Sequence, residues 1–151
     1  MHRYTLVPSP FFKKENASEI LSEAVRLEPH DKVYYKELPD FQAVLVYAAQ
    51  SSGDTPLIAS MLEGVKQIKD FNKVLVSYDG KTLDIVLVAG DKLLLANSYP
   101  APDHLTGEYF IFAALKQFQI NPEVTAVYFH DTVPFEMQND LFRYCKGAEK
   151  L

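Results

Sequence analysis

Three acidic residues occupy positions along the chain where carboxylates could meet and bind two divalent cations. Asp79 and Asp131 each follow an apolar run typical of a β-strand, and Glu108 precedes a long apolar stretch typical of a helix. Two-metal nucleases use carboxylates at such positions to hold cations about 4 Å apart, where they activate water and stabilise the leaving oxygen. Asp79, Glu108 and Asp131 therefore allow one catalytic hypothesis, a two-metal nuclease.

The same three residues also have ordinary structural explanations. Asp79 precedes Gly80 in a turn-forming pair, and Asp131 is a loop residue. Glu108 is expected in the first turn of its helix, where the helix dipole favours acidic side chains. We favour this structural explanation and predict no metal site.

Composition limits the possible functions. The chain has 151 residues, 48% of them hydrophobic, and a net charge of −5, so it can bury a core in one or two small domains. The negative charge argues against a nucleic-acid partner. The single cysteine, Cys145, cannot form an internal disulfide, and no apolar run is long enough for a signal peptide or a membrane span. We expect a soluble cytoplasmic protein without membrane insertion.

The first 70 residues are expected to form three strands and two helices. The strands are predicted at residues 3–7, 32–38 and 42–49, and the helices begin after Asn16 and Thr55. Asn16 with Glu19 resembles a capping box, which would fix the start of the first helix. The segment 42–49 is apolar with little alternation, so it is expected to be buried on both faces.

The remaining residues, 71–151, follow a more distinctive order. Strands are predicted at 73–78, 82–89, 92–98 and 125–130, with helices at about 103–119 and 134–145. This β-β-β-α-β-α order is that of the ribonuclease-H-like core, a mixed α/β sheet with an antiparallel meander and a parallel strand. The first of these helices is apolar on nearly all sides, so we expect it to be well buried.

Several segments resemble an uncharacterised bacterial family known mostly from Bacteroidetes. The resemblance is carried by residues 4–12, 55–58, 84–86, 90–93 and 97–98. It implies an actin-like ATPase fold with two ribonuclease-H-like halves, a partial first half at 1–70 and a second half at 71–151. Family members are longer, with an upstream three-stranded meander, and the terminal strand after Cys145 is expected to be shortened here.

The resemblance also locates the turn that binds phosphate in active actin-like ATPases. That turn has the form Asp-x-Gly-x-Gly-Thr-Thr-Asp, and its small residues let backbone N–H groups close on the phosphates. The remnant in this chain comprises Ser77, Asp79, Gly80, Lys81, Thr82 and Asp84. Ser77 replaces the first Asp, and Asp79 and Lys81 replace both glycines. The glycine pair expected on the adenosine side is replaced by His130 and Asp131, so we predict no nucleotide cofactor.

No other catalytic pattern is present in the sequence. The four histidines, His2, His30, His104 and His130, lack the spacing of a zinc site. Cys145 lies among apolar residues, where a free thiol is usually a core residue. The sequence therefore favours a degenerate actin-like protein that binds or assembles without catalysis, through a protein partner or self-association. The nuclease and an active nucleotide-binding ATPase remain as alternatives.

Residues 4–12 are the predicted partner contact. They combine a short strand, two prolines and the adjacent pair Phe11 and Phe12, which could extend a sheet edge and bury much apolar area. The alternative is that this segment completes a sheet of its own chain and links the two halves.

Overall fold

The computed structural model describes residues 3–151, whose contacts group them into two units. One unit ends at Ala59 and the other is Ser60–Leu151. The assignment of residues 1–70 and 71–151 to two halves of an actin-like protein stays a prediction.

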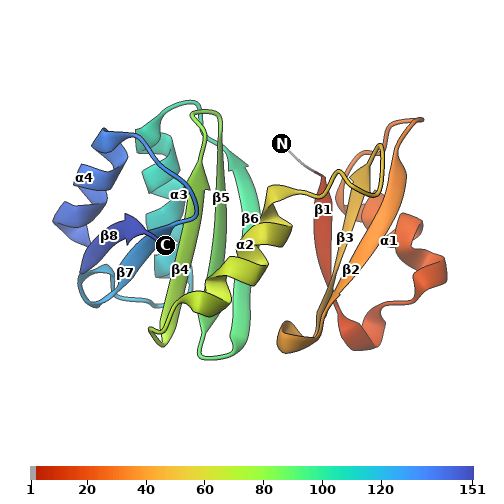
Figure 1. Ribbon diagram of the computed structural model, residues 1–151, viewed down its shortest axis with the longest axis horizontal. Coiled ribbons are helices and arrows are strands. Elements are labelled where there is room, and N and C mark those ends of the chain that lie inside the picture. The colour runs from red at the N-terminus through yellow and green to blue at the C-terminus, as the bar shows by residue number, and fades with distance from the viewer. Residues whose placement is uncertain (1–2) are drawn as a thin grey trace. The chain divides into compact units, whose positions relative to one another are not determined.

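The N-terminal unit is a three-stranded antiparallel sheet with one helix on it (Figure 1). The strand order is β1 (Tyr4–Pro8), β3 (Ala43–Ala49) and β2 (Lys32–Leu38). All seven residues of the central strand β3 are buried, as its apolar sequence predicts. Alternate β3 side chains pack with Leu21 of α1 (Ala17–Ala24). This core holds the unit together.

The start of the first helix and the end of the second differ from what the sequence predicts. The helix α1 begins at Ala17, but the Asn16 side chain makes no capping hydrogen bond, so the predicted capping box is wrong. A 3₁₀ turn at Lys14–Asn16 leads into the helix instead. The second helix, α2 (Leu57–Gly64), is followed directly by a 3₁₀ turn at Val65–Gln67, so the helical segment extends beyond the α-helix itself.

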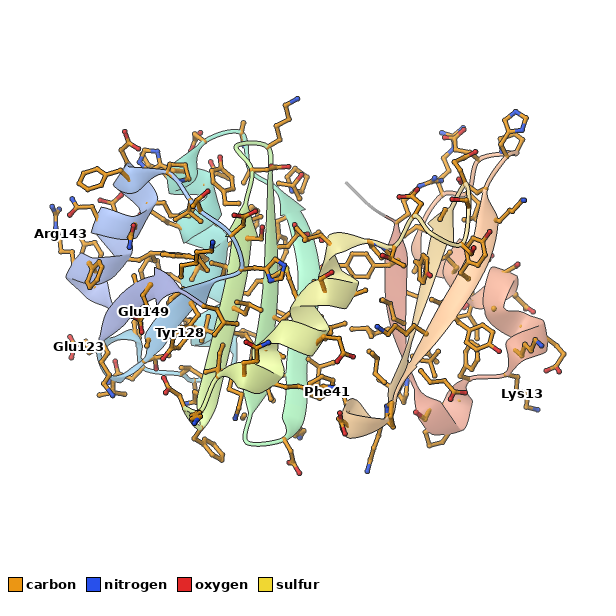
Figure 2. The ribbon with its side chains drawn as sticks, in the orientation of Figure 1. Lys13, Phe41, Glu123, Tyr128, Arg143 and Glu149 are labelled. Carbon is orange, nitrogen blue, oxygen red and sulfur yellow. The ribbon has the colours of Figure 1, made fainter. Side chains whose placement is uncertain are left out.

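The C-terminal unit is a five-stranded mixed sheet in the order β6-β5-β4-β7-β8. Its strands are β4 (Asn72–Tyr78), β5 (Thr82–Ala89), β6 (Lys92–Pro100), β7 (Ala126–Phe129) and β8 (Gly147–Lys150). The first three form the predicted antiparallel meander, and β7 pairs in parallel with β4. The short strand β8 pairs in parallel with β7, and Figure 2 shows the register partners Tyr128 and Glu149 beside each other. The predicted β-β-β-α-β-α order is confirmed, with one further strand.

Two helices cover one face of this sheet (Figure 1). They are α3 (His104–Gln117) and α4 (Phe135–Tyr144). Side chains of α3 and α4 join alternate residues of β4, β5 and β7 in one core that includes the fully buried Leu115 and Leu141. Among residues 3–151, no helix has the length and apolar character needed to cross a bilayer.

The helix α3 is less buried than its sequence predicts. Leu105 and Tyr109 are exposed although they belong to its apolar stretch, and the acidic Glu108 between them is buried. The helix is buried where it packs on the sheet, as expected, but part of its apolar stretch faces outward. Only the side facing the sheet and α4 is covered.

Candidate functional site

The remnant phosphate turn is a tight β-hairpin. Ser77 and Asp84 are register partners on β4 and β5, and the next pair, Tyr78 and Leu83, is the last one before the turn. Gly80 has a φ of +93°, a conformation that glycine adopts without strain. Of the remnant residues, Ser77, Thr82 and Asp84 belong to the paired strands, and Asp79, Gly80 and Lys81 form the turn between them.

The Asp79 carboxylate occupies two backbone donors of this turn. Its Oδ1 accepts hydrogen bonds from the N–H groups of Lys81 and Thr82, both at 2.8 Å. These bonds, with that of Lys81 the stronger influence, hold the pKa of Asp79 below its usual range. An anion would have to compete with an internal carboxylate that is already charged and hydrogen-bonded. A phosphate could use these two N–H groups only if the Asp79 carboxylate first released them.

Neighbouring hydrogen bonds hold the hairpin in place. The Lys81 carbonyl accepts from the Ala101 N–H at 2.8 Å, and the Tyr78 hydroxyl donates to the Ala101 carbonyl at 2.9 Å. The Ser98 hydroxyl donates to the carboxylate of Asp84, which is thus engaged across β5 and β6. These hydrogen bonds hold the strands on both sides of the turn.

Asp131 and Asp79 both follow the carboxyl ends of strands, on the same side of the sheet. The strands β4 and β7 are parallel, with Val76 opposite Phe129, so the carboxyl ends of both strands lie on the same side of the sheet. Asp131 is exposed and its Oδ1 accepts from the Thr132 N–H at 2.7 Å. This local bond is that of a loop residue, as the structural explanation expects.

Glu108 lies elsewhere than the first helical turn expected from the sequence. Since α3 begins at His104, Glu108 belongs to its second turn and is only 7% exposed. Within residues 3–151, the group of three or more possible metal ligands whose atoms all lie within 4.8 Å is His104, Glu108 and Asp140. The structure therefore brings Glu108 to Asp140 and does not bring it to Asp79 and Asp131.

The cluster of His104, Glu108 and Asp140, here called the α3–α4 cluster, has unusual electrostatics. His104 Nε2 lies 3.9 Å from Glu108 Oε2 and 3.8 Å from Asp140 Oδ2. Burial, together with hydrogen bonding to Asp140 and repulsion from its charge, raises the pKa of Glu108 to about 7. The histidines lack the sequence spacing of a zinc site, but the packing of two helices brings His104 close to Glu108 and Asp140. The spacing of four residues between His104 and Glu108 was the available signal.

Cys145 is expected to be almost unreactive in the folded protein. Burial raises the pKa of its thiol to about 11, so roughly a thousandth is thiolate at pH 8. We expect Ellman's reagent to modify native Cys145 at least about a hundredfold more slowly than the urea-unfolded chain, as followed by thionitrobenzoate absorbance. Similar rates in the two states would contradict a buried, inert thiol.

Comparisons with known proteins agree with this architecture. A family model described as "Protein of unknown function (DUF3822)" matches residues 1–146. A crystal structure from Bacteroides thetaiotaomicron, described as a protein with actin-like ATPase fold and unknown function, matches 99% of the chain at 20% identity with a TM-score of 0.80. A PilM–PilN type IV pilus biogenesis complex matches 100% of the chain at 14% identity with a TM-score of 0.51. No curated protein matches the chain significantly.

The two structural likenesses confirm the predicted actin-like fold. At identities of 20% and 14% they show the fold alone. The chain spans 65% and 66% of the lengths of those two proteins, about two thirds of each. Its activity and partners must therefore be inferred from its own residues.

Proposed function

This chain belongs to the DUF3822 family of proteins of unknown function, and we propose that it is a non-catalytic binding or assembly module. In this proposal the actin-like fold has lost nucleotide chemistry and acts through a protein partner or a copy of itself. We place it in the cytoplasm, because its single cysteine requires no oxidising compartment.

The occupied phosphate turn is the observation that carries the proposal. Asp79 fills the backbone donors of Lys81 and Thr82, and it adds negative charge where a phosphate must approach. The glycine pair on the adenosine side is also replaced, by His130 and Asp131. Loss at two separate positions supports a protein without a nucleotide cofactor.

Exposed apolar side chains on α3 and α4 support the binding role. Large apolar residues that are exposed on these helices are Leu105, Tyr109, Phe135, Phe142 and Tyr144. An open pocket of about 440 Å³ lies at one end of the two helices, lined by Phe112, Asn121, Pro122, Glu123 and Tyr144. Figure 2 labels Glu123, on the segment before β7, and Arg143, on α4. Exposed aromatic residues around a pocket are typical of protein-binding surfaces.

The likeness to the PilM–PilN structure is consistent with this role. That structure is described as a complex, so an actin-like fold of related shape is found in a protein assembly. The geometry gives less support to the two-metal nuclease, because Glu108 joins Asp140 instead of Asp79 and Asp131.

Calorimetric titration of the full-length protein with Mg-ATP and Mg-GTP tests the proposal. We expect no binding heat up to about millimolar nucleotide, because the turn donors are already satisfied. An active actin-like ATPase titrated in parallel is the positive control, and circular dichroism verifies that the protein is folded. A micromolar dissociation constant would overturn the degenerate assignment.

A further inference from the structure

The packing of α4 on α3 places three possible metal ligands together. His104 and Glu108 are four residues apart on α3, so their side chains lie on the same side of the helix. Asp140 comes from α4. Gly107 lies at the contact, where an added Cβ would come within 2.9 Å of Met137 Cε, so the absence of a side chain allows the close approach.

One oxygen of this cluster is buried without a hydrogen-bond partner. Glu108 Oε2 is the buried side-chain polar atom that remains unpaired among the described residues. Its separation of 3.9 Å from His104 Nε2 is in the range of an ion pair but is too long for a hydrogen bond. Burying an unpaired carboxylate oxygen is costly, so the fold retains an unfavourable group that a ligand could satisfy.

We propose that His104, Glu108 and Asp140 form a binding site for one divalent transition-metal cation, with Zn²⁺ as the best fit. One imidazole nitrogen and two carboxylate oxygens suit Zn²⁺, whereas Mg²⁺ and Ca²⁺ prefer oxygen ligands alone. The cation would give Glu108 Oε2 the partner that it lacks.

The geometry allows this ion with a small contraction. Atoms bound to tetrahedral Zn²⁺ at about 2.0–2.2 Å from the ion lie roughly 3.3–3.6 Å from one another. The separations of 3.9 and 3.8 Å from His104 Nε2 therefore need to shorten by only a few tenths of an ångström. The side chains of His104 and Asp140 are 31% and 25% exposed, so an ion can enter from solvent and keep water at its fourth position.

A shared proton is the competing way to satisfy the same oxygen. A proton between the Glu108 and Asp140 carboxyl groups would pair the two residues without any metal. The two states differ in metal stoichiometry, so direct titration with metal separates them.

The test is calorimetric titration of chelator-treated full-length protein with ZnCl₂. We expect one ion per chain with a dissociation constant of about a micromolar or tighter, and binding of Mg²⁺ and Ca²⁺ at least about a hundredfold weaker. Binding of Zn²⁺ weaker than about 100 µM would overturn the site and leave the shared proton as the explanation.

Single substitutions then locate the ion. Glu108→Gln keeps the shape of the side chain, and His104→Gln alters a more exposed residue that is less important for folding. Each is expected to weaken Zn²⁺ binding at least about tenfold to a hundredfold, because one of three protein ligands loses its charge or its imidazole. Glu136→Gln is the matched control, an exposed acid on α4 outside the cluster, and should bind as the wild type does. Wild-type affinity in both Glu108→Gln and His104→Gln would place the ion elsewhere and overturn the proposal.

Discussion

Replacing Phe12 with alanine is expected to lower the free energy of unfolding by about 2–3 kcal/mol, whereas Phe11→Ala should change it by less than about 0.5 kcal/mol. Phe12 is half-buried and packs against the core of the N-terminal unit. The centre of its ring lies 5.0 Å from the centre of the Tyr35 ring. Phe11, its neighbour, is 76% exposed. The difference follows from the apolar contacts that only Phe12 loses.

Thermal and urea unfolding of the two variants and the wild type provide the measurement. Phe11→Ala is the matched control, since it removes the same side chain one residue away. Equal melting temperatures for the two variants would show that Phe12 does not belong to the core, in contradiction with the packing described above.

This result bears on the role of residues 4–12. The strand β1 pairs with β3 from Tyr4↔Tyr47 to Pro8↔Ala43, so the segment completes a sheet of its own chain. That agrees with one part of the second alternative raised by the sequence, while a link between the two halves stays a prediction. A partner contact within the segment would have to use exposed residues such as Phe11, and a change there should leave stability intact.

Much of the fold can be predicted because local signals and burial agree. The apolar run that forms β3 predicts a central strand, and the Asp79–Gly80 pair predicts the β4–β5 hairpin. The Asp103 side chain caps α3 by accepting from the Thr106 N–H at 2.8 Å, at about the residue where the sequence predicts the helix to begin. In each case a few adjacent residues determine the structure.

The sequence could not predict that the Glu108 side chain faces α4 and the core, for a physical reason. The helix α3 is apolar on nearly all sides, so periodicity gives no sign of which side faces the core. The packing of α4 decides it, and this contact joins residues distant in the chain. For the same reason the sequence identifies Asp79 but does not show that its carboxylate turns inward onto the amides of Lys81 and Thr82.

Tyr144→Ala is expected to weaken the association of this protein with its partner, or with itself, by about thirtyfold or more. Tyr144 is 55% exposed, forms a wall of the 440 Å³ pocket and meets the Phe112 ring edge-on at 6.1 Å. An exposed aromatic ring held by a second ring loses little entropy on binding, and it can bury much apolar area against a partner. Those properties are typical of interface residues that contribute most to affinity.

Sedimentation velocity measures self-association, and affinity capture from the native host followed by titration with the purified partner measures hetero-association. Phe71→Ala is the matched control, because Phe71 is 72% exposed but lies outside α3 and α4, and its variant should bind within about twofold of the wild type. Tyr109→Ala provides a second test on α3 if the melting temperature of Tyr144→Ala falls. Unchanged association in both Tyr144→Ala and Tyr109→Ala, with the control also unchanged, would exclude α3 and α4 as the binding surface. Loss of association in the Tyr144 variant alone would assign the pocket as the point where a partner side chain enters. Phe112, which also lines the pocket, is already partly buried against the core.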